Sequence, residues 1–200
     1  MNYNSIEAET FLDRLRNITS QSHKSLEELP VSLSIVNPAV TQEEYAHYLW
    51  LMHDVVKDAE TNIFPALTGI IPDLKERSKF RHLEDDLKIL RESKSTYDTP
   101  LSNEEKFSIP FALGIMYVIE GSTLGGRFIL KNITEALGYD AQQGAKYFAG
   151  YGNATGSRWK NFLNHMVQYQ EQQECEDEII AGANFAFTRI NEHFTQNTPQ

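Results

Sequence analysis

The chain has only one cysteine among its 200 residues. A single cysteine excludes a disulfide within the chain and a zinc cluster built on several cysteines. This residue, Cys175, lies next to Glu174, Glu176 and Asp177. Neighbouring negative charges raise the pKa of a thiol, so we expect Cys175 to be a poor nucleophile.

Long apolar runs are also missing. No run reaches the length of a membrane-spanning helix, and the first residues lack a charged region followed by an apolar stretch. The net charge is −10, from 28 acidic and 18 basic residues, which argues against binding to nucleic acid or an anionic membrane. No segment has the alternation of a strand, and we see no repeat or linker. We expect one soluble, cytoplasmic, all-α domain over residues 1–200, with its core at about 10–195 and a frayed tail from residue 196.

Helical periodicity and capping signals divide the chain into helices. Thr41 and Glu44 have the spacing of a capping box and precede a run of apolar residues at helical spacing. Pro110 suits the first turn of a helix, and Gly138 suits the residue just past a helix end. We therefore expect one long helix over residues 110–137. Its first half is apolar nearly all round, so it should be a central element.

The first amphipathic helix carries a histidine on its apolar stripe. The stripe consists of Leu12, Leu15, Thr19, His23 and Leu26, in steps of three or four residues. A neutral imidazole is a good iron ligand and usually needs a partner that fixes its tautomer. Glu27 lies one turn after His23 and is a candidate for that partner. On spacing alone, a buried core histidine that bonds a carbonyl or a carboxylate is the better interpretation.

Three glycines interrupt the long apolar helix: Gly121, Gly125 and Gly126. Each glycine inside a helix costs about 0.8–1 kcal/mol relative to alanine, so a compensating contact is expected. Close approach of another backbone to the bare face is one explanation. A planar macrocycle with a small gas ligand, lying against the backbone, is the other. The residues by themselves leave both explanations open.

Together, the two segments resemble the haem oxygenase family, most closely its bacterial members that produce biliverdin. Haem oxygenases have a basic residue, a threonine, the proximal histidine and a glutamate; Arg16, Thr19, His23 and Glu27 match them at the same spacing. The family also has a glycine-rich distal helix, which the segment Gly121–Gly126 resembles closely. In the animal enzymes an aspartate follows the first glycine and organises distal water, whereas this chain has Ser122 there.

The resemblance implies an all-α, single-domain helical bundle with haem between the first, proximal helix and a glycine-kinked distal helix. It makes His23 the axial ligand of the haem iron. The implied catalytic residues of the distal helix are Gly121, Ser122, Gly125 and Gly126. The implied contacts of the haem are Arg16, Thr19, Glu27, Tyr117, Arg158 and Lys160. Phe185 and Phe187 are further candidates for the macrocycle edge, although core packing explains either one better.

The implied reaction opens haem, which is both cofactor and substrate, to biliverdin, carbon monoxide and ferrous iron. It uses dioxygen and an external electron donor of the ferredoxin or flavin reductase type, and no nucleic-acid or membrane partner is expected. Two alternatives stay open: a non-catalytic haem-binding or haem-trafficking homologue, and a helical interaction module or small-molecule protein on the same fold. A di-iron site is rejected, because Glu44 and His47 have no second Glu-x-x-His copy.

Overall fold

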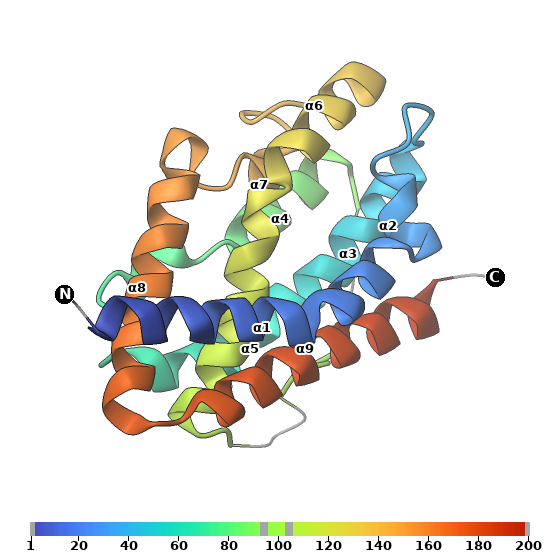
Figure 1. The fold of residues 1–200 in the computed structure, drawn as a ribbon. Helices are drawn as coiled ribbons and strands as arrows, with labels where there is room; N and C mark the ends of the chain where they lie inside the picture. Colours follow the sequence, from blue (N-terminus) through green and yellow to red (C-terminus); the bar gives the residue numbers. More distant parts are fainter. Residues whose placement is uncertain (1–2, 93–95, 103–105, 199–200) are drawn as a thin grey trace.

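The computed structural model describes the backbone of residues 3–92, 96–102 and 106–198, and the side chains of these residues from Phe11 onward. Within these ranges the chain forms helices and no β-strand, as predicted. The α-helices are α1 (Tyr3–Glu27), α2 (Pro30–Ser34), α3 (Gln42–Asp58), α4 (Phe80–Ile89), α5 (Ile109–Gly121), α6 (Gly126–Leu137), α7 (Lys146–Ala149), α8 (Thr155–Gln173) and α9 (Glu176–Asn197). Shorter turns are η1 (Ala59–Ile63), η2 (Phe64–Leu67), η3 (Leu74–Arg77), η4 (Ser122–Leu124) and η5 (Gly152–Ala154). Figure 1 shows α1 and α9 side by side, with α5 crossing behind them.

The start of α3 is the capping box that the sequence predicted. The Thr41 hydroxyl accepts a hydrogen bond from the Glu44 amide at 3.2 Å, and the Glu44 carboxylate accepts one from the Thr41 amide at 2.8 Å. The π-helical turn η1 follows α3 and carries Glu60. Glu60 accepts hydrogen bonds from the amides of Lys79 and Phe80 at 2.6 and 3.2 Å. These bonds satisfy backbone donors at the start of α4.

The helix predicted over residues 110–137 is two helices. Ser108 caps α5 and Pro110 lies in its first turn. The turn Ser122–Leu124 is a 3-10 helix, and the two parts of the pair meet at an angle of 44°. The second part ends at Gly138, as predicted, where φ is 76°. The glycines thus bend the segment, as the resemblance implied, and the bend divides the expected helix into two.

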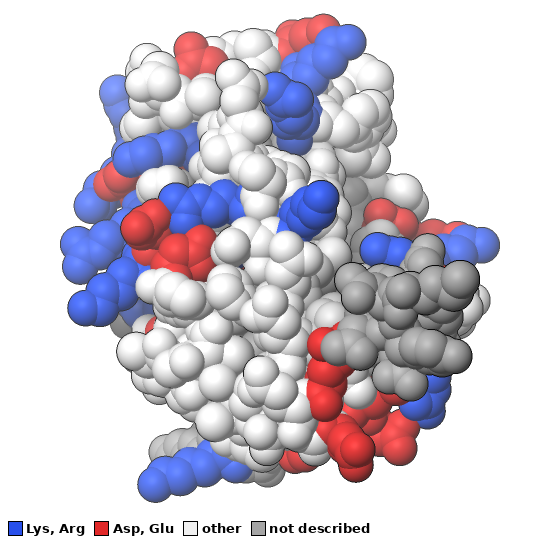
Figure 2. Space-filling view, turned by 60° about the vertical axis from the view of Figure 1, so that its left-hand side comes forward, with Lys and Arg blue, Asp and Glu red and all other residues white. Residues whose placement is uncertain are grey.

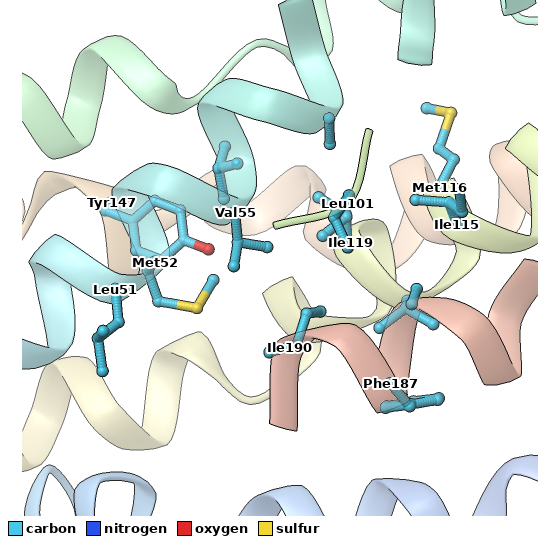
Figure 3. Close-up of a cluster of buried hydrophobic side chains, with 14 of the residues drawn as sticks. Leu51, Met52, Val55, Leu101, Ile115, Met116, Ile119, Tyr147, Phe187 and Ile190 are labelled. Atoms are coloured by element: carbon cyan, nitrogen blue, oxygen red, sulfur yellow. The ribbon is translucent and has the colours of Figure 1, made fainter. Parts of the chain in front are cut away.

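The core lies where α3, α5 and α9 meet. Figure 3 shows apolar side chains from these helices in one cluster, among them Leu51, Met52, Val55, Ile115, Ile119, Phe187 and Ile190. Burial of each such side chain stabilises the fold by about 1.5–3 kcal/mol. The first half of α5 is buried nearly all round. The prediction that this segment is a central element is therefore confirmed.

Both α1 and α5 pack against α9. At the crossing of α5 and α9, a β-carbon placed on Gly114 would lie 2.0 Å from the carbonyl oxygen of Ile179. Only a residue without a side chain allows this approach. At the start of α9, Glu176 and Asp177 accept hydrogen bonds from Arg14 of α1 at 2.5 and 2.8 Å. The last helix is thus the common support for the two segments that the sequence singled out.

The C-terminal end of α9 extends to Asn197, past the point where fraying was expected, residue 196. The Thr198 hydroxyl donates a hydrogen bond to the carbonyl of Phe194 at 2.7 Å and closes the last turn. Residues 199 and 200 lie outside the described part of the chain.

Among the described helices, none by itself has the length and apolarity of a membrane span. The bent pair of α5 and α6 meets both criteria only when its two parts are counted together.

Candidate functional site

His23 lies in the last two turns of α1, and 57% of its side chain is exposed. The prediction of a buried position was wrong. The buried part of the stripe ends at Thr19, and one turn later the imidazole meets the Phe187 ring of α9 edge-on, with centroids 5.6 Å apart. Nδ1 of His23 lies 3.6 Å from a carboxylate oxygen of Glu27, the expected partner. This arrangement leaves Nε2 as the nitrogen for a metal.

Arg16 of α1 and Tyr117 of α5 lie close enough to interact electrostatically. Burial raises the pKa of Tyr117, and the positive charge of Arg16 opposes that shift. Arg16 is exposed and lies 3.3 Å from its neighbour Asp13. Thr19, unlike Arg16, is buried, and its hydroxyl donates a hydrogen bond to the Leu15 carbonyl at 2.8 Å. Its polar group is therefore used within α1.

The segment Gly121–Gly126, here called the glycine segment, contains glycines in two different surroundings. Gly126 is buried, and a β-carbon added there would lie 2.6 Å from the carbonyl oxygen of Phe148. At Gly121 an added β-carbon would touch the ring of Trp159 at 3.5 Å, an ordinary contact. Gly125 is exposed, and an added β-carbon would meet a single protein atom, at 3.9 Å. Close packing thus explains why position 126 carries glycine, whereas at Gly125 the backbone has an open face.

Exposed side chains on both sides of Gly125 complete this face. Leu124 and Phe128, four positions apart, are 48% and 67% exposed, so both leave apolar surface in solvent near Gly125. Ser122 is also exposed, and its hydroxyl donates to the carbonyl of Ile119 at 2.8 Å. Burial raises the pKa of Tyr147, and an interaction with Ser122 opposes that shift. Thr123, the other hydroxyl residue of the segment, donates to the carbonyl of Glu120 at 2.7 Å. The glycine segment therefore combines apolar side chains with two hydroxyls, each bonded to a backbone carbonyl.

A buried ion network lies next to the glycine segment. Glu120, the residue before Gly121, is 1% exposed. Its carboxylate accepts hydrogen bonds from Arg77 at 2.6 Å, from Lys79 at 2.8 Å and from the Tyr151 hydroxyl at 2.8 and 2.9 Å. The sequence analysis identified none of these four residues. The signal was Glu120 itself, a lone carboxylate in an apolar helix.

Charge is balanced within this network. Arg77 also donates to both carboxylate oxygens of Asp73, at 2.8 and 2.9 Å. Arg158 joins the network through Asp73 and Glu76, so three cations face three carboxylates. Burial disfavours the charge on Arg77, but its bonds to Asp73 and the charge of Glu120 outweigh burial and raise the pKa of Arg77. Burial, together with Glu120, raises the pKa of Tyr151 and keeps the phenol a hydrogen-bond donor. The network thereby fixes the start of the glycine segment against η3 and its neighbours.

The two basic residues predicted on α8 differ in their surroundings. Arg158 donates to Asp73 and Glu76, both at 2.5 Å. Its charge is already matched, so the structure does not favour Arg158 as a contact of an anionic ligand. Lys160 is exposed and forms no ion pair with another residue of the described ranges. Figure 2 shows Lys and Arg side chains gathered along the left of the view, with a smaller number of acidic side chains between them, on a chain with a net charge of −10.

Comparison with known proteins gives one consistent result. The family model described as "Heme oxygenase" matches residues 9–196. The chain belongs to the haem oxygenase family. This family member is 28% identical to Heme oxygenase PigA of Pseudomonas aeruginosa over 180 residues, which cover 90% of the chain and 88% of PigA.

Solved structures share the fold of this haem oxygenase family member. The NO- and CO-bound heme oxygenase of Neisseria meningitidis matches with a TM-score of 0.76 and 26% identity, over 94% of this chain and 91% of that one. Heme oxygenase of Leptospira interrogans gives 0.72 and 16% identity over 93% and 98% of the chains. Heme oxygenase-1 of Synechocystis sp. PCC6803, solved in complex with heme, gives 0.69 and 17% identity over 93% and 91%. The predicted all-helical haem oxygenase fold is confirmed.

Proposed function

We propose that this protein is a haem oxygenase that opens haem to biliverdin, carbon monoxide and ferrous iron, with His23 as the axial ligand. One observation carries the proposal: an imidazole that is 57% exposed has a carboxylate 3.6 Å from Nδ1, so Nε2 is left for iron. Metal-binding histidines commonly use the second nitrogen in this way, to orient the ring and raise its basicity. Membership of the haem oxygenase family supports the same assignment.

The residues around the glycine segment fit a flat apolar macrocycle. Gly125 offers backbone with an open face, and the exposed Leu124 and Phe128 flank it. On α9, the Phe187 ring that lies against His23 adds a further apolar surface. Phe185 instead packs against Phe107 and Phe111, at centroid distances of 5.4 and 5.3 Å. We therefore assign Phe187, and not Phe185, to the haem edge.

Haem, when bound, supplies both the redox-active iron and the ring that is cleaved, while the protein positions both. His23 would hold the iron through Nε2, with Glu27 beside Nδ1. Gly125 keeps a side chain away from the distal side, Gly126 lets the segment pack against Phe148, and Gly121 lies against Trp159. The Ser122 hydroxyl is the polar group that we assign to the distal side. Electrons come from an external donor of the ferredoxin or flavin reductase type.

We also propose that residues 1–200 form a single domain. The buried apolar residues of the described part of the chain form one continuous core, which supports this proposal.

The propionates of haem need positive or hydrogen-bonding partners. We assign this role to Arg16 and Tyr117, which lie close together across α1 and α5, and to the exposed Lys160. The phenol of Tyr117 has a raised pKa and so remains a donor. Glu27 acts through His23, whereas Thr19 contributes to the packing of α1.

The test is a titration of the purified protein with hemin, followed by reduction in air and chromatography of the product. We expect a one-to-one complex with a Soret band and conversion to biliverdin. His23→Ala should lose the axial ligand and most of the turnover, whereas His165→Ala, a matched control on α8, should behave as the wild type. A His23→Ala spectrum identical to that of the wild type would exclude His23 as the ligand. Binding without turnover would indicate a haem-trafficking protein, and the absence of a Soret band would exclude a haem protein.

A further inference from the structure

A buried carboxylate of α4 holds the start of α7. Asp86 is 1% exposed, and its two carboxylate oxygens accept hydrogen bonds from the backbone amides of Lys146 and Tyr147, at 2.9 and 2.8 Å. These are the first two amides of α7, which have no acceptor within their own helix. The side chain of the residue before a helix often bonds such amides, but here that residue is Ala145, which has no polar side chain. Asp86 therefore supplies from another helix the cap that α7 lacks.

The helix α7 contacts the glycine segment at two neighbouring points. The carbonyl oxygen of Phe148 lies against Gly126, where an added β-carbon would be 2.6 Å from it. Tyr147 interacts with Ser122, and this interaction opposes the rise that burial causes in the pKa of Tyr147. In agreement, α7 packs against both α4 and α6. A displacement of α7 would therefore move Gly126, and with it Gly125, whose open backbone face belongs to the proposed haem site.

The helix α7 is too short to keep its position by itself. It has four residues, and a single helical turn fixes many dihedral angles for few hydrogen bonds. Tyr147 and Phe148 are buried. Figure 3 shows Tyr147 in the same apolar cluster as Met52 and Val55. Apolar burial is not directional, so it does not fix the orientation of the α7 backbone. The two hydrogen bonds to Asp86 do fix it, because each bond requires its donor and acceptor to be aligned.

We propose that Asp86 is a positioning residue of the haem site: it holds α7, and α7 holds the glycine segment in place. The proposal rests on the function proposed above and concerns a buried residue that acts through another element. A carboxylate suits this role, because its two oxygens accept hydrogen bonds from two neighbouring amides at once. The side chain of asparagine has a single acceptor oxygen, and its NH2 group would face the second amide. An aliphatic side chain would satisfy neither amide.

Amide hydrogen exchange of the haem-free full chain tests this path of contacts. Asp86→Asn removes one of the two acceptors but also a buried charge, so the variant should keep its fold, which a circular dichroism melting curve checks. We expect exchange about tenfold faster in residues 146–149 and 121–128, because one hydrogen bond is lost. Exchange in residues 186–194 of α9 should not change. Asp85→Asn is the matched control, because Asp85 is the next residue, is half exposed and bonds the side chain of Lys146 at 3.1 Å; its exchange should equal that of the wild type.

The haem-bound protein provides a second measurement. Asp86→Asn displaces the glycine segment but not His23, so its affinity for hemin should stay within about twofold of the wild type while turnover falls about tenfold. The stretching frequency of carbon monoxide bound to its ferrous haem should shift. Asp85→Asn should match the wild type in affinity, turnover and frequency.

Equal exchange of residues 121–128 in Asp86→Asn and Asp85→Asn would overturn the proposal. Equal turnover of hemin by the two variants would do the same. A wild-type protein that binds no hemin would overturn the function proposed above, whereas the exchange measurement would still decide whether Asp86 positions the glycine segment.

Discussion

Gly114 of α5 and Gly182 of α9 face each other so closely that a β-carbon on Gly114 would lie 2.9 Å from the carbonyl carbon of Gly182. The relation is mutual, because a β-carbon on Gly182 would lie 2.1 Å from the carbonyl oxygen of Phe111. The two backbones touch directly at this crossing. Since α9 also supports α1 and meets His23 through Phe187, the crossing sets how α1 and α5, the two helices that lead into the proposed haem site, lie relative to each other.

Gly114→Ala should lower the free energy of unfolding. The added methyl group has no room, and overpacking of this kind costs about 1–3 kcal/mol, more than the gain of about 1 kcal/mol in helix propensity. Urea unfolding measures the change. Gly156→Ala is the control, because a β-carbon at this position of α8 meets no atom within 4 Å. A stability of Gly114→Ala equal to that of Gly156→Ala would contradict the close contact.

Adjacent substitutions in the glycine segment should have different effects. Gly126→Ala should destabilise the protein, because its methyl group would meet the Phe148 carbonyl oxygen at 2.6 Å. At Gly125 a larger side chain has room, so Gly125→Leu should have the same midpoint of urea unfolding as the wild type. In haem assays, Gly125→Leu should reduce turnover more than haem affinity, since its side chain occupies the space for dioxygen. A larger loss in affinity than in turnover would refute the distal assignment.

Lys79 and Glu120 should be strongly coupled in stability. Removal of one partner from a buried ion pair costs about 3–5 kcal/mol, because the other charge stays buried. A double-mutant cycle of Lys79→Met and Glu120→Gln should therefore give a coupling of about 1.5 kcal/mol or more. The reference pair is Lys131 and Glu135 on α6, which lie 3.8 Å apart with side chains 74% and 68% exposed. Its coupling free energy should stay below about 0.5 kcal/mol. Equal coupling free energies for the two pairs would show that burial of Lys79 and Glu120 does not strengthen their interaction.

Asp86 should make stability fall as the pH rises from about 4 to 6. Burial raises its pKa from 3.8 to about 6, although the amides of Lys146 and Tyr147 donate to its carboxylate at 2.9 and 2.8 Å. In this window the folded state binds a proton that the unfolded state has released, so the free energy of unfolding decreases with pH. A shift of this size corresponds to about 3 kcal/mol. The slope should be absent in Asp86→Asn and unchanged in Glu171→Gln, as measured by urea unfolding between pH 4 and 7. A slope retained in Asp86→Asn would assign it to another group.

Local features of the sequence determined where helices begin and end. The capping box of Thr41 and Glu44 forms as predicted, and Gly138 ends α6. The pairing of His23 with Glu27 also follows from their spacing on one helix. Each of these features depends on residues within about one helical turn of each other, so hydrogen bonding and periodicity along the chain define them.

Only the tertiary structure decided how the candidate site is built. Arg77 and Glu120 are 43 positions apart, and no spacing rule predicts that they share a buried hydrogen bond. Gly125 and Gly126 are adjacent glycines that the sequence does not distinguish, yet only Gly126 packs against a carbonyl of another helix, that of Phe148 in α7. The physical reason is the same in both cases: charge pairing and close backbone contact depend on which segments meet in space. Here η3 meets α5 and α6 meets α7, and these meetings are set by tertiary packing and not by spacing along the chain.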